Sequence, residues 1–331
     1  MSEPRHGPDA LYRNVSLPYT VTLPVLGIPV RFESNSRTAL GVIEGAYGRW
    51  RSLDVAPGLV GQETVCVRLI VHVGDEGGAK RPPMTYRMPD ADRIIVATPG
   101  SFGIGDASRR EGVAYVTRDL LAEPDHLRYG LLDAITLVLV TKHDRTPVHA
   151  SVVMRGGTAL VLAGPSGTGK STLAYAALRA GMNVLTDDAA YIQTEPEFRL
   201  WGMPGLLNLP PDARDAFPEL RDRVPRLLAN GKEKIVVDVR TETTGDDPPV
   251  AARAGVCLLT RDGGAASLVP ASRREVDDFL TRGLDVSRGL YEEFRSQAIA
   301  RLSDGGGWRL NLSSDPADGV RFLAGIFEEL E

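Results

Sequence analysis

A strand, a glycine-rich loop and a helix follow one another without a break over residues 157–180, and this order restricts the fold more than any other part of the chain. The apolar run GTALVLA (157–163) is typical of a buried strand. GPSGTG (164–169) contains three glycines, which permit a tight loop, and STLAYAALRA (171–180) has the composition of a helix. A strand that passes directly into a helix in this way indicates a sheet-centred α/β unit.

The same loop matches a phosphate-binding pattern, in which a glycine is followed by four residues and then by Gly-Lys-Ser. Backbone N–H groups of such a loop and of the helix N-terminus can surround phosphate oxygens. Lys170 can reach the β- and γ-phosphates, and the Ser171 hydroxyl can ligate magnesium. We therefore expect ATP and Mg²⁺ to bind here. The expected contact residues are Gly164, Pro165, Ser166, Gly167, Thr168, Gly169, Lys170, Ser171 and Thr172.

Two adjacent aspartates, Asp187 and Asp188, end the next apolar run. A carboxylate at the end of a neighbouring strand is where nucleotide-bound magnesium needs a ligand. Successive side chains of an extended chain diverge, so one aspartate can hold metal while the other faces the acceptor. The alternative is a helix cap or a solvated turn. His149, in TPVHASVVM, is expected on a strand just before the loop strand, where a lone histidine is more often structural.

The rest of the sequence indicates two domains after a loose tail at residues 1–15. Residues 16–140 predict a smaller N-terminal α+β domain, whose role in acceptor recognition is suggested by its position alone. Its longest helical stretch is residues 127–144. Residues 141–331 predict the domain with the loop, whose short β-branched runs form a mixed sheet. The expected strands are TPVHASVVM, TALVLAG, MNVLTDD, EKIVVDV and AGVCLLT; two helices, in SRREVDDFLTRGL and DPADGVRFLAGIFEEL, close the chain, and 238–254 is an exposed loop.

Composition excludes several classes of protein. A formal net charge of −5 disfavours a protein built to bind nucleic acid, and no run of eighteen apolar residues predicts a membrane span. The first residues are polar and give no secretory signal. Cys66 and Cys257 lie in apolar stretches and are expected as buried thiols of a cytoplasmic protein, not as a disulfide or metal site. The sequence is compatible with a homo-oligomer.

Residues 147–192 resemble the catalytic domain of the HPr kinase/phosphorylase family. The resemblance is carried by His149-Ala150, the loop from Gly164 to Ser171, Gly181 and the Asp187-Asp188 pair. It implies a phosphoenolpyruvate-carboxykinase-like kinase core, with His149 close to the phosphates and the metal. It further implies that Asp187 is the base toward the acceptor hydroxyl and that Asp188 is the metal ligand, so that His149, Lys170, Asp187 and Asp188 form the catalytic set.

The chain departs from the family after the acidic pair, where HPr kinases carry Glu-x-Arg-Gly-x-Gly. If Gly202 matches the first glycine, Arg199 stands in place of the glutamate and Trp201 in place of the arginine. The resemblance therefore implies a kinase without phosphorolysis, whose acceptor is not HPr. Some such relatives phosphorylate a serine of a ribosomally made peptide, such as a lasso-peptide precursor. Lys232 and Lys234 are candidates to contact phosphate or acceptor in place of that arginine, against the alternative of a solvated turn.

Three functions remain open on the sequence. The first is an ATP-dependent kinase that transfers the γ-phosphoryl group to a serine of a peptide or protein. The second is a kinase of a small metabolite. The third is a nucleotide-binding regulatory protein whose catalysis has decayed, which the missing glutamate and arginine favour.

Overall fold

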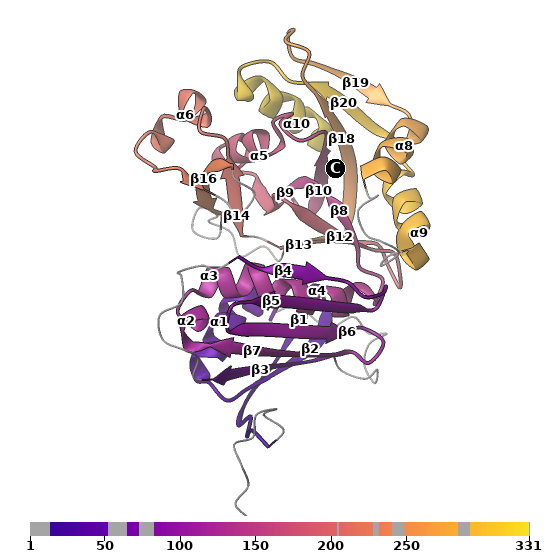
Figure 1. Ribbon diagram of the computed structural model, residues 1–331. Helices are drawn as coiled ribbons and strands as arrows, with labels where there is room; N and C mark the ends of the chain where they lie inside the picture. Colours follow the sequence, from indigo (N-terminus) through magenta and orange to yellow (C-terminus); the bar gives the residue numbers. More distant parts are fainter. Residues whose placement is uncertain are drawn as a thin grey trace, which may run out of the picture. The chain divides into compact units, whose positions relative to one another are not determined.

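The computed structural model describes residues 14–51, 65–72, 83–203, 205–227, 232–239, 249–283 and 292–330. Most of the expected tail, residues 1–13, lies outside these ranges. The chain divides into two compact units, Met1–Lys142 and His143–Glu331, and each combines helices with a mixed sheet (Figure 1). This agrees with the α/β class expected from the sequence.

The first unit is built on one seven-stranded sheet, in the order β1-β2-β3-β7-β6-β5-β4. β2, β3 and β7 run parallel, and the other neighbours are antiparallel. The strands are β1 (Tyr19–Val25), β2 (Ile28–Ser34), β3 (Val65–His72), β4 (Thr85–Arg87), β5 (Arg93–Thr98), β6 (Ser101–Asp106) and β7 (Glu111–Thr117). The helices are α1 (Arg37–Tyr47), η1 (Gly48–Trp50), α2 (Arg118–Leu121), α3 (Pro124–Leu127), η3 (Arg128–Leu132) and α4 (Asp133–Thr141).

The helical stretch expected at residues 127–144 is confirmed in its centre and corrected at its ends. It consists of the end of α3, a π-helical turn (η3) and α4, which stops at Thr141. Ile135 of α4 packs closely against the sheet, because three strand residues on that face are glycines. They are Gly103, Gly105 and Gly112.

The second unit contains three sheets among its described residues. The six-stranded sheet has the order β11-β9-β10-β18-β20-β19, the four-stranded sheet β17-β13-β12-β8, and the three-stranded sheet β14-β16-β15. The strands are β8 (Thr146–His149), β9 (Ser151–Arg155), β10 (Thr158–Ala163), β11 (Asn183–Thr186), β12 (Ala189–Gln193), β13 (Arg199–Gly202), β14 (Leu206–Leu209), β15 (Arg226–Leu227), β16 (Glu233–Asp238), β17 (Val250–Ala251), β18 (Arg253–Thr260), β19 (Ser267–Ala271) and β20 (Gly307–Asn311). The helices are α5 (Lys170–Arg179), α6 (Ala213–Ala216), η4 (Pro218–Leu220), α8 (Arg273–Gly283), α9 (Glu292–Ser303) and α10 (Pro316–Leu330).

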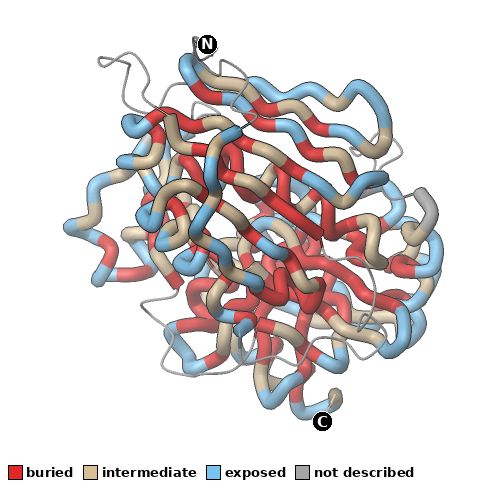
Figure 2. Tube along the Cα trace, turned by 90° about the horizontal axis from the view of Figure 1, so that it is seen from below, coloured by how far each residue is buried: buried red, intermediate tan, exposed pale blue. Residues whose placement is uncertain are grey.

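Two apolar cores enclose the six-stranded sheet, one on each face. α5 and α10 cover one face together with the three-stranded sheet, and α8 and α9 cover the other with the four-stranded sheet (Figure 1). Figure 2 shows the buried residues in red along the Cα trace. β10 and β18 lie at the centre and run parallel, so their carboxyl ends meet at one edge of the sheet.

Three details of the second unit differ from the expectations. TPVHASVVM is broken at Ala150 into β8 and β9, which belong to different sheets. Residues 238–254 are not wholly a loop, because Val250 and Ala251 form β17 and Arg253 begins β18; residues 240–248 lie outside the described residues. The two closing helices are present as α8 and α10, but α9 was not expected, since its few apolar residues give it a weak helical pattern.

Both cysteines are buried strand residues without a disulfide, as expected. Burial raises the pKa of the Cys257 thiol to about 12.

Candidate functional site

The glycine-rich loop, Gly164–Gly169, connects the carboxyl end of β10 to the first residue of α5. Gly167 and Gly169 have φ angles of +85° and +115°, which favour glycine. Gly164 lies against the neighbouring strand β18, where a Cβ atom would stand 3.1 Å from the Leu259 carbonyl oxygen. The Thr168 hydroxyl donates to the Pro165 carbonyl at 2.8 Å and holds the loop from within. The three glycines are therefore needed by the shape of this loop.

The N-terminus of α5 opens directly onto the loop. Gly169 is the N-cap residue and has no side chain to accept from the first N–H groups of the helix. The N–H groups of that first turn have no partner within the helix, and the helix dipole adds a partial positive charge there. This end of α5 therefore favours an anion.

Lys170 is the first residue of α5 and is buried. Its Nζ donates to the carbonyl oxygens of Gly164 and Pro165, at 2.7 and 3.2 Å. Burial lowers the pKa of this ammonium group, and the charges of Asp187 and Asp188 oppose that shift. Lys170 thus lies over the loop, within electrostatic reach of both aspartates.

Two chain segments, β8–β9 and β11–β12, connect the six-stranded sheet with the four-stranded sheet. β9 pairs with β11 in the first sheet, and β8 pairs with β12 in the second. The crossing points are Ala150 in one segment and Asp187-Asp188 in the other, joined by a hydrogen bond from the Ala150 N–H to the Asp188 carbonyl at 3.2 Å. The sheet change at these residues gives the two aspartates different surroundings.

Asp187 is partly buried and held on several sides. Its Oδ1 accepts from the Ser151 hydroxyl at 2.7 Å and its Oδ2 from the Asn208 backbone N–H at 3.1 Å. The nearby Ser171 hydroxyl also lowers the pKa of this carboxylate. Burial raises the pKa of Asp187 more than these hydrogen bonds lower it. The Asp187 side chain therefore lies near the first turn of α5.

Asp188 is exposed and interacts with His149 instead. His149 Nδ1 lies 3.1 Å from Asp188 Oδ1, and the two side chains are 61% and 88% exposed. The hydrogen bond raises the pKa of His149 and lowers that of Asp188. An ionised carboxylate and an imidazole are therefore presented to solvent beside Lys170, whose charge acts on both.

Arg199 and Trp201, which the sequence comparison with the HPr kinase motif singled out, have structural contacts. Arg199 forms an ion pair with Glu197. Trp201 is buried, donates from its indole Nε1 to Gln193 Oε1 at 2.9 Å, and lies under the guanidinium of Arg145, 5.2 Å from the ring centroid. Neither of these contacts involves the glycine-rich loop.

Gly202, the matched glycine, is required by close packing against β11. A Cβ atom at Gly202 would lie 2.8 Å from the Leu185 carbonyl carbon and closer still to its oxygen. Gly202→Ala is expected to lower the free energy of unfolding by about 1–3 kcal/mol, because the backbone of Leu185 cannot move without shifting β11. Denaturant unfolding measures this. Gly305→Ala, which meets nothing within 4 Å, is the control and should change stability by less than about 0.5 kcal/mol. Equal stability of the two variants would contradict the packing role.

The two lysines proposed as extra cations belong to the segment of β16. Lys232 is exposed just before this strand, and Lys234 is half-buried within it, paired in register with Arg226. β16 also pairs with β14, whose Asn208 donates to Asp187. A contact of either lysine with phosphate or acceptor stays a prediction.

Two contacts of the site had no clear signal in the sequence. Ser151 follows His149 by two residues, and its hydroxyl reaches Asp187 only because the strand breaks at Ala150. Asn208 contributes through its backbone N–H, which any residue other than proline possesses. The one sequence feature that pointed to these contacts is Ser151, two residues after His149.

The hydroxyl of Ser171 and the carboxylate of Asp187 are oxygen ligands of the kind that Mg²⁺ prefers. Magnesium in nucleotide sites takes one or two protein oxygens, and phosphate oxygens and waters supply the rest. The Ser171 hydroxyl lies close enough to Asp187 to lower the pKa of its carboxyl, so the chemistry and placement of this pair fit the ion. No group of three or more His, Cys, Asp or Glu residues among the described residues could hold a metal alone.

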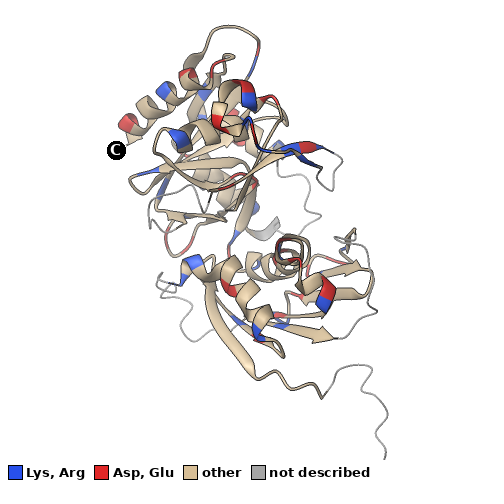
Figure 3. Ribbon diagram, turned by 90° about the vertical axis from the view of Figure 1, so that its left-hand side faces the viewer, with Lys and Arg blue, Asp and Glu red and all other residues tan. Residues whose placement is uncertain are grey.

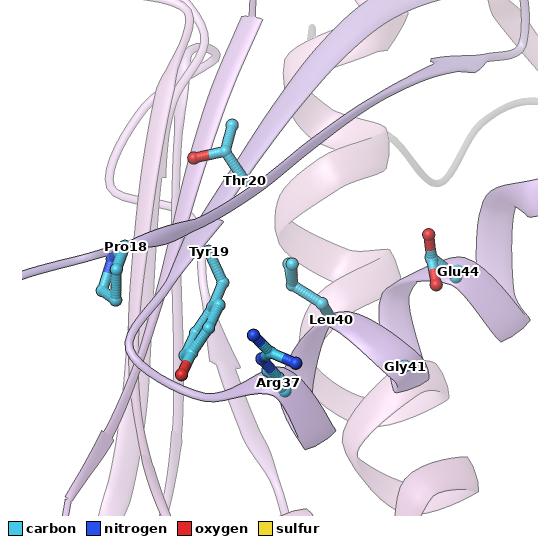
Figure 4. Close-up of a pocket in the computed structure, with 7 residues that line it drawn as sticks. All are labelled: Pro18, Tyr19, Thr20, Arg37, Leu40, Gly41 and Glu44. Carbon is cyan, nitrogen blue, oxygen red and sulfur yellow. The ribbon is translucent and has the colours of Figure 1, made fainter.

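The first unit has a shallow depression of about 400 Å³ between β1 and α1 (Figure 4). It is lined by Pro18, Tyr19, Thr20, Arg37, Leu40, Gly41 and Glu44. The guanidinium of Arg37 lies over the Tyr19 ring, 5.1 Å from its centroid. A cation, a carboxylate and an aromatic ring thus border an open surface in this unit.

Neither the known protein families nor the curated proteins include a match to this chain. Among solved structures, the chain is similar to that of the Hpr(Ser) kinase/phosphatase from Coxiella burnetii, with 14% sequence identity. The similarity covers 36% of this chain and 69% of that chain, with a TM-score of 0.22. At these values it establishes neither a family nor the details of a fold.

The described helices include none that is both long and apolar enough to cross a membrane. Acidic and basic residues both occur along α10 (Figure 3).

Proposed function

We propose that this protein is an ATP-dependent kinase that transfers the γ-phosphoryl group to a hydroxyl, with a serine of a peptide or protein as the acceptor. The observation that carries the proposal is the convergence of five side chains at the glycine-rich loop. Lys170 and Ser171 come from the start of α5, Asp187 and Asp188 from the turn between β11 and β12, and His149 from the end of β8. Phosphoryl transfer needs positioned charge more than covalent chemistry, so these groups suffice.

The loop and Lys170 hold the triphosphate in this proposal. N–H groups of the loop and of the first turn of α5 donate hydrogen bonds to the phosphate oxygens, as expected for an anion site at a helix start. Lys170 Nζ exchanges its bonds to the Gly164 and Pro165 carbonyls for bonds to the β- and γ-phosphates. Ser171 and Asp187 would hold Mg²⁺, which supplies charge neutralisation to the phosphates when bound.

Asp188 serves as the base toward the acceptor hydroxyl, and His149 orients it. This reverses the roles implied by the family resemblance. Asp187 accepts from Ser151 and the Asn208 N–H and lies near Ser171, the expected magnesium ligand of the loop, so it is suited to hold the metal. Asp188 is exposed and can reach an incoming hydroxyl. The phosphoenolpyruvate-carboxykinase-like core and the use of the first unit for acceptor recognition belong to the same proposal.

The experiment that tests the proposal uses ATP labelled at the γ-phosphate, Mg²⁺ and a degenerate peptide library with one fixed serine. Label recovered as phosphoserine, and absent from a matched library with alanine at that position, is the expected result. Transfer to small hydroxyl compounds but not to peptides would favour a metabolite kinase. Nucleotide binding without turnover would favour the regulatory protein, which the replacement of the family's glutamate and arginine supports.

The reverse reaction is expected to be absent. Arg199 and Trp201 are held by Glu197 and Gln193 and do not supply the family's phosphorolysis residues. Phosphopeptide from the forward reaction, incubated with inorganic phosphate, should release no pyrophosphate above background. The same enzyme preparation must remain active with ATP. Pyrophosphate formation at a rate comparable with the forward reaction would show this prediction to be wrong.

A further inference from the structure

Arg261 brings a second cation to the glycine-rich loop. It follows β18, the strand parallel to β10, and both strands end at the same edge of the sheet. One Nη nitrogen of Arg261 lies 3.1 Å from the position that a Cβ atom of Gly169 would occupy. Gly169 directly precedes Lys170 and caps α5. The guanidinium therefore lies at the last residue of the loop, beside the start of the helix.

The Arg261 guanidinium is exposed and, within the described part of the chain, forms no ion pair or hydrogen bond. Other arginines of this unit have carboxylate partners, as Arg273 has in Asp304 and Arg309 in Glu275. The adjacent Asp262 does not pair with Arg261, because its Oδ1 accepts from the Gly264 N–H and from the Asn311 side chain. The charge of Arg261 is thus available to a ligand.

The backbone next to Arg261 is held in place from β20. Asn311, which is buried, accepts from the Asp262 N–H at 3.1 Å. Its Nδ2 donates to Asp262 Oδ1 at 2.7 Å and to the Ala265 carbonyl at 3.0 Å. These bonds fix the turn that follows Arg261, so the backbone of the arginine is held in a defined position beside the loop.

We propose that Arg261 binds the phosphate chain of the nucleotide, as a cation supplied by the same chain beside Lys170. The proposal rests on the proposed function, since it assumes a nucleotide at the loop. A triphosphate carries more negative charge than one lysine offsets, and an arginine can donate two parallel hydrogen bonds to phosphate oxygens. Arg261 and Lys170 come from different elements, so together they hold the phosphates from two directions.

The test is a set of calorimetric titrations with three probes: Mg²⁺-ADP, the Mg²⁺ complex of the β,γ-imido analogue of ATP, and inorganic tripolyphosphate. Arg261→Gln and Arg261→Met are two neutral variants, the second of which keeps the apolar stem. Both should bind the imido analogue and tripolyphosphate about 10- to 100-fold more weakly than wild type, the effect of a hydrogen bond to a charged group. Arg261→Lys should lose less, because it keeps the charge. All variants should keep the wild-type melting temperature without ligand.

The matched control is Arg253→Gln. Arg253 is the first residue of the same strand, opposite Thr158 at the start of β10, and donates to the Leu330 carbonyl. The Arg253→Gln variant should bind all three probes with the affinity of the wild-type protein.

Wild-type affinity in both neutral variants would overturn the proposal and leave the proposed function intact. Weaker nucleotide binding with unchanged tripolyphosphate binding would also overturn it, because Arg261 would then contact the base or ribose. If the wild-type protein binds none of the probes, the proposed function itself fails and this inference fails with it.

Discussion

Lys170→Ala is expected to reduce ATP-dependent phosphotransfer to below detection. Lys170 Nζ already lies on the loop, bonded to the carbonyls of Gly164 and Pro165, and is the lysine that the phosphate-binding pattern requires for the β- and γ-phosphates. A cation that stabilises the transferring phosphoryl group contributes about 10³-fold or more to the rate. Initial rates of label transfer from γ-labelled ATP, at several ATP concentrations, measure the loss.

Two further variants make the Lys170 result interpretable. Lys170→Met keeps an apolar stem in the buried position, so a loss of activity at an unchanged melting temperature isolates the charge. Arg179→Ala removes a cation from the other end of α5, where Arg179 pairs with Glu219 at 3.0 Å, and should leave the rate unchanged. Undiminished phosphotransfer by Lys170→Ala would show that the glycine-rich loop is not part of the active site.

The local parts of the site could be predicted from the sequence because their signals are local. The strand, loop and helix at residues 157–180 occupy consecutive positions, and β10 and α5 have nearly the expected bounds. The apolar run before Asp187 likewise forms β11. In each case the residues that decide the structure are neighbours in the chain, so pattern and propensity are sufficient.

The long-range parts of the site could not be predicted. Nothing in TPVHASVVM shows that the strand changes sheets at Ala150, and this change separates the surroundings of Asp187 from those of Asp188. Arg261 is ninety-one positions after Lys170 in the sequence (261 − 170) and reaches the loop only through the parallel pairing of β10 and β18. Sheet order and register are properties of the assembled sheet, so a single sequence does not specify them locally.

Replacing Asp187 and Asp188 by asparagine should impair different steps, metal-nucleotide binding in one variant and turnover in the other. An amide offers one oxygen to a metal but cannot accept the proton of a hydroxyl. Asp187→Asn keeps one acceptor oxygen for its donors, Ser151 and the Asn208 N–H, and loses the negative charge. We expect weaker Mg²⁺-ATP binding in this variant, partly restored by higher Mg²⁺ or by Mn²⁺.

Asp188→Asn should retain wild-type affinity for Mg²⁺-ATP, because Asp188 is exposed and interacts with His149 rather than with Ser171. Its turnover should fall by about 10²–10⁴-fold, the usual contribution of a positioned general base. Calorimetric titrations of nucleotide beside turnover, at two Mg²⁺ concentrations, separate the two effects. The reverse pattern, with metal rescue of Asp188→Asn and intact nucleotide binding in Asp187→Asn, would restore the roles implied by the family resemblance. Near-normal nucleotide binding and turnover in both variants would show that Asp187 and Asp188 have only a structural role in the turn. The kinase proposal would then fail.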